Sequence, residues 1–403
     1  MNVLFLTLTA FDDINDRGIY YDLMRNIVSK GHNLYVVSPI EHKFKRETFV
    51  HSNENCAILR VKTLNIQKTN IIEKGIGTLI IENQFKKAII KFFKNVKFDL
   101  IIYSTPPITF TNVITFLKKR DNAKTYLLLK DIFPQNAVDL GFFSKKSLFY
   151  NFFRKKEQML YAISDKIGCM SPANCSYLEK HNPNLDKNKI HINPNSIEIT
   201  EIEIPDTKTI IQLKTKYNIP LNSTIFIYGG NLGKPQGIIY LIKLLELKKN
   251  ISEIFFLIVG SGTEYSTVEN WYNKNMPNNV KVLNYLPKKE FDLLISISDV
   301  GLIFLDPRFT IPNFPSRLLS YLEYSIPVLA ATDKNTDIGL IAEQNGFGLW
   351  CENGDLPKMS AHIDVLVLNP TLRKTMGKKG NVFLQTNYSV QFSYQQIFNE
   401  SIS

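Results

Sequence analysis

Short apolar, β-rich runs alternate along the chain with stretches whose apolar residues recur at helical spacing. Residues 3–8 form the first apolar run, residues 19–28 have one apolar helical face that ends at Gly31, and residues 34–37 form the next run. This order predicts a strand–helix–strand unit. Its first loop is expected at the carboxyl edge of a parallel sheet, where α/β folds bind ligands.

The same alternation continues through both halves of the chain. Further apolar runs that predict strands are residues 100–103, 125–129, 166–170, 190–192, 224–228, 254–259, 280–283, 300–305, 327–330 and 348–350. An acidic segment with few helix signals, residues 193–207, interrupts them and is a hinge candidate. Two consecutive βα-repeating halves predict an α/β protein with two Rossmann-like domains that face a central cleft.

The predicted domains are residues 1–197 and residues 198–375. A polar helical tail follows over residues 376–403, for which a return to the first domain is one option. At 403 residues the chain is long enough for two domains with full cores. Its content of 44% hydrophobic and 21% charged residues is typical of a globular protein.

Several features favour a cytoplasmic protein. No apolar run approaches the ~20 residues of a membrane-spanning helix. The first residues have neither the basic region nor the cleavage site of a secretory signal peptide. The four cysteines, at positions 56, 169, 175 and 351, have no metal-site or disulfide spacing.

The stretch from residue 224 to residue 245 combines an apolar strand, a glycine-rich turn and an apolar helical face. Four glycines between residues 229 and 237 surround Lys234 in that turn. Glycines let backbone N–H groups approach a phosphate, a helix N-terminus attracts anions, and lysine adds a positive charge. The pattern is neither a Walker A loop nor a GxGxxG fingerprint. A tight connection that binds nothing is therefore an alternative interpretation.

Basic residues are concentrated in the first half of the chain. Residues 1–200 contain 29 Lys and Arg against 18 Asp and Glu, a net charge of +11, whereas the remaining 19 basic and 19 acidic residues cancel. Such a one-sided charge attracts nucleic acid, anionic lipid or acidic ligands. Because the chain has no nucleic-acid-binding motif, we expect no nucleic-acid partner.

A basic amphipathic helix is predicted within this half, over residues 85–97. Its apolar face contains Phe85, Ala88, Ile89, Phe92, Phe93 and Val96, and its lysines are Lys86, Lys87, Lys91, Lys94 and Lys97. Helices of this kind lie on anionic bilayers. The expected membrane contacts are Phe85, Lys86, Lys87, Lys91, Phe92, Phe93 and Lys94, and residues 150–156 form a second aromatic and basic run. An ordinary surface helix whose apolar face packs on the sheet is the alternative.

Four segments in order along the chain resemble the GT4 glycosyltransferases, which have the GT-B fold and transfer sugars from nucleotide-sugars with retention of configuration. They are residues 17–23, residues 131–134, residues 230–237 and residues 315–319. The resemblance covers roughly residues 1–380 and is closest to the bacterial capsule and O-antigen enzymes. It implies that the second domain binds the nucleotide-sugar and the first domain the acceptor.

The resemblance also implies roles for individual residues. Lys234 and Arg317 would hold the diphosphate whose charge develops as the sugar leaves. The family's histidine near the acceptor has no clear counterpart here. Asp131 is instead the candidate for orienting or deprotonating the acceptor hydroxyl, with a buried loop-capping aspartate as the alternative. The implied nucleotide-sugar contacts are Gly18, Gly230, Asn231, Gly233, Lys234, Gly260, Tyr285, Leu286, Pro315, Ser316, Arg317, Ser320 and Glu323. No D-x-D metal motif occurs, so we expect no metal or other cofactor.

The chain departs from the family at two glutamates spaced eight residues apart. Their positions are occupied here by Pro312 and Ser320, and in the family the second glutamate contacts the ribose hydroxyls. Glu323 lies three residues after Ser320, close to one helical turn away. It is a candidate replacement, with a solvated helix residue as the alternative.

The resulting hypothesis is a retaining hexosyl- or N-acetylaminosugar transferase. It would move a sugar from a nucleotide-sugar, with UDP as the expected nucleotide, to a lipid-linked oligosaccharide at the inner face of the cytoplasmic membrane. A nucleotide-sugar 2-epimerase shares the two-domain fold, but it needs acid–base residues for a sugar C2 proton, and no convincing carboxylate and histidine set is present. A non-catalytic polysaccharide-assembly protein, inactive through the change at Ser320, is the other alternative.

Overall fold

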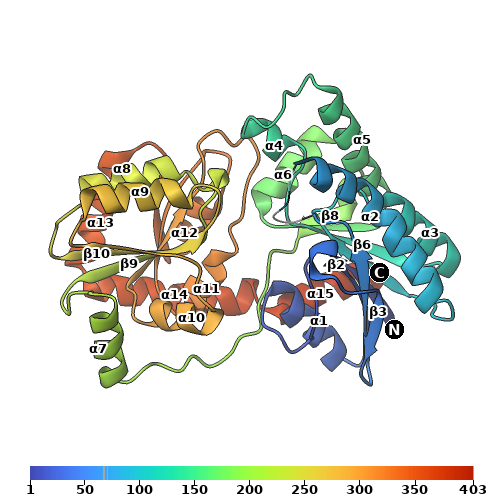
Figure 1. The fold of residues 1–403 in the computed structure, drawn as a ribbon, viewed down its shortest axis with the longest axis horizontal. Coiled ribbons are helices and arrows are strands. Elements are labelled where there is room, and N and C mark those ends of the chain that lie inside the picture. Colours follow the sequence, from blue (N-terminus) through green and yellow to red (C-terminus); the bar gives the residue numbers. More distant parts are fainter. Residues whose placement is uncertain (67–68, 70, 403) are drawn as a thin grey trace. The chain divides into compact units, whose positions relative to one another are not determined.

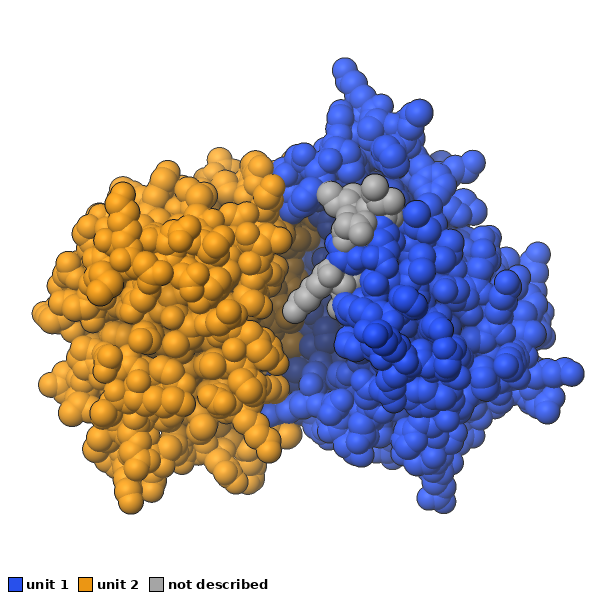
Figure 2. All heavy atoms as spheres, viewed as in Figure 1, with its two compact units in different colours: residues 1–198, 388–403 blue, residues 199–387 orange. Residues whose placement is uncertain are grey.

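The computed structural model describes residues 1–402 except residues 67, 68 and 70. It divides into two compact units, each built on its own sheet: unit 1 contains residues 1–198 and 388–403, and unit 2 contains residues 199–387 (Figure 2). The predicted domain boundary at residue 197 lies one residue from this division. The predicted start of the tail at residue 376 is wrong, because it falls inside helix α14 (Pro370–Asn387).

Eight strands of the described chain form the sheet of unit 1, in the order β3-β4-β2-β1-β5-β6-β7-β8 (Figure 1). All neighbours are parallel except β3 and β4, which form an antiparallel pair that the sequence pattern did not predict. The strands are β1 (Asn2–Leu6), β2 (Asn33–Glu41), β3 (Phe49–Ser52), β4 (Cys56–Thr63), β5 (Leu100–Ser104), β6 (Lys124–Leu129), β7 (Lys166–Cys169) and β8 (Ile190–Ile192).

Helices cover both faces of this sheet, with α1 and α15 packed together on one face. None of the described helices is long and apolar enough to cross a membrane. The helices of unit 1 are α1 (Ile19–Ser29), α2 (Ile71–Phe92), α3 (Thr111–Asp121), α4 (Gln135–Asp139), α5 (Leu148–Ile163), α6 (Pro172–His181) and α15 (Val390–Ile402), with short 3₁₀ turns η1 (His42–Phe44) and η2 (Lys187–Lys189).

The sheet of unit 2 has six parallel strands in the described chain, in the order β11-β10-β9-β12-β13-β14. The strands are β9 (Thr224–Asn231), β10 (Ile254–Ser261), β11 (Val280–Leu283), β12 (Val300–Phe304), β13 (Val328–Thr332) and β14 (Gly348–Glu352). The helices are α7 (Thr207–Lys216), η3 (Lys234–Gln236), α8 (Ile238–Leu247), α9 (Tyr265–Asn275), α10 (Lys288–Ser296), α11 (Arg317–Glu323), α12 (Ile338–Gln344), α13 (Leu356–Leu368) and α14.

Strand β9 shows how its continuous apolar sequence fits a sheet that is covered on both faces. Successive side chains of a strand point to opposite faces. Phe226 and Tyr228 belong to the core that α8 completes. On the other face, a Cβ added to Gly229 would lie 2.0 Å from the Phe291 ring of α10. Helices α8 and α9 are accordingly drawn on one side of this sheet and α10 and α11 on the other (Figure 1).

The C-terminal helix belongs to unit 1. Where the chain returns, the N–H of Ile197 donates to the carbonyl oxygen of Tyr388 at 3.0 Å. Beyond this point α15 packs beside α1, and His32 bonds to the hydroxyl of Tyr394 at 2.8 Å and stacks on the ring of Phe398. These contacts make residues from both ends of the chain part of one core.

The predicted membrane helix over residues 85–97 is wrong in two respects. Helix α2 ends at Phe92, and the side chains of Phe85 and Phe93 are 0% and 4% exposed. They pack inside unit 1 and cannot contact a bilayer, so the alternative interpretation, an apolar face packed on the domain, holds for them. The other expected contacts are the exposed Lys87, Lys91, Phe92 and Lys94 and the half-buried Lys86.

Candidate active site

The glycine-rich turn and Arg317 meet at the carboxyl end of β9. The guanidinium carbon of Arg317 lies 4.2 Å from the centre of the Tyr228 ring, and Nη2 donates to Oε1 of Gln236 at 2.8 Å. Nη1 is buried and has no hydrogen-bond partner among the described residues. We call these three residues the arginine clamp. Arg317 is half-buried as a residue. A buried donor nitrogen without a partner is unusual in a folded protein, and a guanidinium that keeps one is suited to an anionic ligand.

Backbone geometry explains why glycine is required beside the clamp. Gly230 has φ of 111°, a conformation that side chains disfavour, and a Cβ there would lie 3.8 Å from Nη2 of Arg317. A Cβ at Gly260, on the neighbouring strand, would lie 1.9 Å from the carbonyl oxygen of Gly230. Gly237 has φ of 57° where η3 leads into α8. The turn therefore needs glycine at each of these positions.

The partners of Arg317 leave its charge uncompensated. Burial raises the pKa of Tyr228, with the charge of Arg317 acting in the opposite direction. The phenol therefore stays neutral at physiological pH, and the side-chain amide of Gln236 carries no charge at any pH. The clamp consequently fixes the position of a full positive charge without neutralising it.

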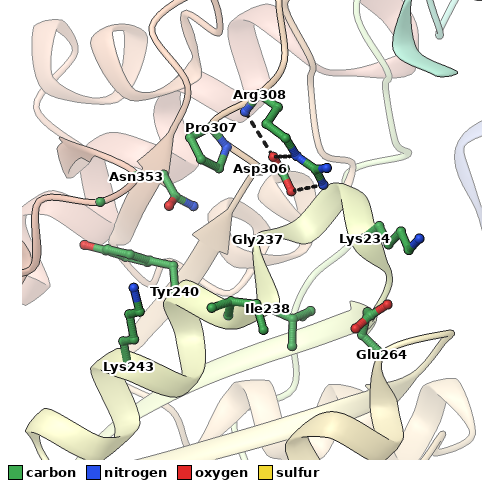
Figure 3. Close-up of a pocket in the computed structure, with 12 residues that line it drawn as sticks. Lys234, Gly237, Ile238, Tyr240, Lys243, Glu264, Asp306, Pro307, Arg308 and Asn353 are labelled. Atoms are coloured by element: carbon green, nitrogen blue, oxygen red, sulfur yellow. Dashed lines mark hydrogen bonds and ion pairs between the residues drawn. The ribbon is translucent and has the colours of Figure 1, made fainter. Parts of the chain in front are cut away.

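A cavity of about 520 Å³ lies behind the turn within unit 2. Lys234 and Glu264 are at one end of it, and Tyr240, Lys243 and Asn353 are at the other (Figure 3). Lys234 is exposed, and it is the one predicted nucleotide-sugar residue in the cavity wall. The cavity is thus distinct from the arginine clamp, although η3 carries residues of both.

The remaining predicted contacts of unit 2 are placed around the same sheet edge. Tyr285 is 72% exposed and Leu286 half-buried in the loop after β11. A Cβ at Gly233 would lie 3.0 Å from the side chain of Asn231, which places these two together. Pro315 and Ser316 come directly before α11, and Ser320 is half-buried within it.

Glu323 is not placed to bind a ribose in this structure. Glu323 is only 4% exposed, and its carboxylate accepts a hydrogen bond from the hydroxyl of Thr200 at 3.4 Å. The alternative interpretation, a solvated helix residue, is equally wrong. Three residues along a helix leave Glu323 about 60° around the axis from Ser320 and nearly one turn farther on. At that position Glu323 is buried, whereas Ser320 is half-buried.

In unit 1, Asp131 follows β6 at the carboxyl edge of the sheet. Its backbone N–H donates to the hydroxyl of Thr105 at 3.1 Å, whereas its side chain is exposed, which contradicts a buried capping role. The surrounding protein restricts hydration of the carboxylate and raises its pKa to about 6. A carboxylate of this kind suits general-base work near neutral pH.

Lys130 lies at the same sheet edge, Gly18 ends the first loop, and Tyr20 is in the first turn of α1. Burial lowers the pKa of Lys130 to about 7, and its Nζ lies 3.5 Å from the carbonyl oxygen of Asn193. Burial also raises the pKa of Tyr20 to about 12, and the charge of Asp131 adds to this rise. The N–H of Gly18 donates to the Asp22 carboxylate at 3.1 Å at the start of α1.

Three residues of these sites were not predicted from the sequence: Tyr228, Gln236 and Lys130. Tyr228 looks like an ordinary core residue, and Gln236 is one polar residue among several in the turn. Lys130 had a signal, because it directly precedes Asp131 at a predicted strand end. Among the described residues, no group of three or more His, Cys, Asp or Glu is placed to hold a metal ion.

Comparison with known proteins identifies the domain that carries the clamp. Residues 210–382 match the family described as glycosyl transferases group 1. The chain is 24% identical over 302 residues to the probable glycosyltransferase WbjE of Pseudomonas aeruginosa. The matched region covers 74% of this chain and 73% of WbjE. The chain is also 22% identical to the putative colanic acid biosynthesis glycosyl transferase WcaI of Escherichia coli K12. That match covers 61% of this chain and 60% of WcaI.

A solved structure extends the likeness to the whole fold. HepE of Anabaena, crystallised in complex with UDP, superimposes with a TM-score of 0.69 at 14% identity, over 99% of both chains. The two parallel-sheet units agree with this likeness. Residues 210–382 therefore form a glycosyl transferases group 1 domain, and the chain is a glycosyltransferase of the GT-B fold.

Proposed function

We propose that this glycosyltransferase moves a sugar from a UDP-sugar to a lipid-linked saccharide, with retention of anomeric configuration, in the biosynthesis of a surface polysaccharide such as O-antigen or capsule. The observation that carries the proposal is the buried, unused Nη1 of Arg317 beside the glycine turn. The UDP complex of HepE supports the choice of nucleotide, and the name of WcaI supports a polysaccharide product.

Unit 2 is assigned to the donor. When the bond between the anomeric carbon and the phosphate oxygen breaks, negative charge develops on the nucleoside diphosphate and must be stabilised. Tyr228 and Gln236 already hold the side chain of Arg317, so its positive charge has a fixed position before the phosphate binds. Lys234 is exposed on the same turn and supplies a second cation. We assign this charge to the two side chains and to no metal.

Unit 1 is assigned to the acceptor, with Asp131 as the residue that orients or deprotonates its hydroxyl. In the proposed front-face displacement the acceptor oxygen bonds to the anomeric carbon on the face from which the phosphate departs. The acceptor proton passes to the departing phosphate, with Asp131 as the other possible recipient. No covalent enzyme intermediate forms. Because the acceptor carries a lipid, the enzyme works peripherally at the inner face of the cytoplasmic membrane.

The test is to incubate the purified chain with a panel of UDP-sugars and lipid-diphosphate-linked saccharides. Release of UDP together with a new glycoside, and NMR assignment of the same anomeric configuration as the donor, would support the proposal. Inversion at the anomeric carbon would overturn the retaining mechanism. Conversion of the free UDP-sugar into its 2-epimer, without a glycoside, would favour the epimerase.

A further inference from the structure

The first half of α5 combines exposed apolar and exposed basic side chains. Ser147 caps the helix, its side chain accepting from the N–H of Tyr150 at 3.1 Å. The first turns then expose Leu148 to 86%, Phe149 to 69% and Phe152 to 44%. With the exposed lysines Lys145, Lys146 and Lys155 these residues form what we call the α5 surface.

Helical spacing explains why this surface faces outward. Phe153, Glu157 and Leu160 recur at i, i+4 and i+7 and face the unit, since Glu157 and Leu160 are buried and the Phe153 ring lies 5.1 Å from the ring of Phe133. Leu148 and Phe152 lie about 140° and about 100° around the helix axis from Phe153. Phe149 precedes Phe153 by one turn in the same row, and at the start of the helix it is nevertheless 69% exposed. The exposed apolar residues therefore come from the outer side of α5 and from its first turn.

The charge around these apolar residues has one sign. Residues 140–156 contain five Lys and Arg and no Asp or Glu. Arg154 is neutralised by Glu157, with 2.5 Å between Nη1 and the carboxylate. No ion pair involves Lys145, Lys146 or Lys155 among the described residues. Apolar side chains flanked by uncompensated lysines complement a surface that offers hydrocarbon and phosphate together.

We propose that the α5 surface docks on an anionic phospholipid bilayer. Leu148, Phe149 and Phe152 enter the boundary between headgroups and acyl chains, and the lysines contact lipid phosphates. The docking itself does not depend on the proposed function. Its role does, because docking would bring the enzyme to a lipid-linked acceptor. The α5 surface replaces α2 as the docking element, because the apolar stripe predicted there is largely buried.

The anchoring of α5 connects this surface to the acceptor-side carboxylate. Phe133, whose ring contacts those of Phe153 and Phe143, lies two residues after Asp131. The hydroxyl of Tyr150 also donates to Oε1 of Gln135 at 3.4 Å, in the helix that follows the same loop. Docking through α5 thus holds the Asp131 loop at a fixed place relative to the membrane. A saccharide whose lipid stays in the bilayer would be presented there.

The experiment is co-sedimentation of the full chain with vesicles of phosphatidylcholine, with and without phosphatidylglycerol. Three variants are compared with wild type: Lys145, Lys146 and Lys155 changed to Gln; Leu148, Phe149 and Phe152 changed to Ser; and a matched control in which Lys87, Lys91 and Lys94 become Gln. The two lysine variants lose equal charge. Thermal melting and UDP binding show that each variant is folded.

Wild type should bind the phosphatidylglycerol vesicles, and more weakly as salt rises. The α5 lysine variant should lose about 10²-fold in partitioning, because each lysine contributes roughly 1 kcal/mol at an anionic leaflet. The serine variant should lose about 10-fold or more, and the α2 control should stay close to wild type. Equal loss in the two lysine variants, or binding that ignores phosphatidylglycerol, would overturn the proposal.

A fluorescence measurement tests insertion independently. Phe149→Trp should show a blue-shifted emission with vesicles, after subtraction of the wild-type signal. Phe44→Trp, at a position 60% exposed in η1, should not. An unshifted Phe149→Trp spectrum on bound vesicles would exclude insertion of α5. Both measurements use no sugar donor or acceptor, so they can fail while glycosyl transfer succeeds, or succeed while it fails.

Discussion

Replacing Arg317 with methionine should weaken donor binding strongly while leaving the fold nearly unchanged. The substitution loses the charged hydrogen bond to Gln236, worth about 1.5–3 kcal/mol, and the cation–π contact with Tyr228, worth about 0.5–2 kcal/mol. An unpaired buried donor costs about 1–3 kcal/mol, and the substitution regains this energy because it removes Nη1. Methionine keeps a sulfur–aromatic contact of about 0.3–1.5 kcal/mol. The net change in stability should therefore stay within about 2 kcal/mol.

The effect on the ligand should be much larger than the effect on stability. A charged contact made to a phosphate is removed with nothing to replace it, and we expect UDP affinity to fall about 10²-fold, with a similar or larger loss in kcat/KM. Isothermal titration with UDP measures the first quantity and donor turnover the second. Thermal unfolding of the unliganded protein measures the stability.

Arg373→Met is the matched control within the same unit. The guanidinium of Arg373 is committed to the protein, because Nη2 lies 3.4 Å from the Asp299 carboxylate and Nη1 donates to the carbonyl oxygens of Leu366 and Val367. Its replacement should lower stability and leave UDP affinity unchanged. The assignment of the donor site to the clamp is wrong if Arg317→Met unfolds the protein while Arg373→Met lowers the affinity for UDP.

Three further predictions follow from the same contacts. Gln236→Glu should pair with Arg317 and neutralise it, which raises the melting temperature and lowers UDP affinity; unchanged affinity in titration would argue against a charge-based site. Glu323→Ala should lower stability by about 1–3 kcal/mol through its buried contact and leave UDP affinity unchanged. For Asp131, kcat/KM should fall as pH drops below about 6, because the base becomes protonated. Folding raises the pKa of Asp131 from 3.8 to about 6, so between these pH values the folded state binds more protons than the unfolded state. The stability of wild type relative to Asp131→Asn should therefore fall as pH rises through that window, which unfolding measured at several pH values would show.

The strands were predictable because parallel strands covered on both faces must be apolar throughout. All the predicted strands correspond to strands of the structure, with boundaries that differ by a few residues. Neither strand of the antiparallel pair β3–β4 was predicted. Strand β3 is four residues long, half-buried or exposed, and at the edge of its sheet. A short edge strand has no apolar run to reveal it. Strand β4 is largely buried, but Arg60 and Lys62 interrupt its apolar sequence.

Helical periodicity identifies an apolar face but not what covers that face. The stripe of α2 and the exposed face of α5 both combine aromatic residues with lysines. In the structure Phe85 of α2 is 0% exposed and Phe149 of α5 is 69% exposed. Phe85 packs against Phe110, which lies in another segment, with 5.3 Å between the ring centres, and no local pattern contains that information.

The site residues could be found from the sequence only as far as their roles are local. The glycines of the turn were identifiable, because backbone conformation imposes them. The partners of Arg317 were not, since Gln236 lies 81 positions away and Tyr228 farther still. Glu323 shows the reverse error: proximity in sequence to Ser320 suggested a shared role, but nearly one turn farther along the helix Glu323 is buried, whereas Ser320 is half-buried.

The partners of Arg317 distinguish it from the arginines that stabilise the fold. Arg25, Arg60, Arg120, Arg154, Arg308 and Arg373 all form ion pairs with carboxylates. Arg317 forms none among the described residues, and a ring and a side-chain amide hold it instead. An arginine needed only for stability gains most from a carboxylate, which satisfies its donors and cancels its charge. Neutral partners give up that gain, and the buried donor of Nη1 adds a cost. This combination fits the proposed donor site, in which the missing negative charge would arrive with the phosphate of the substrate.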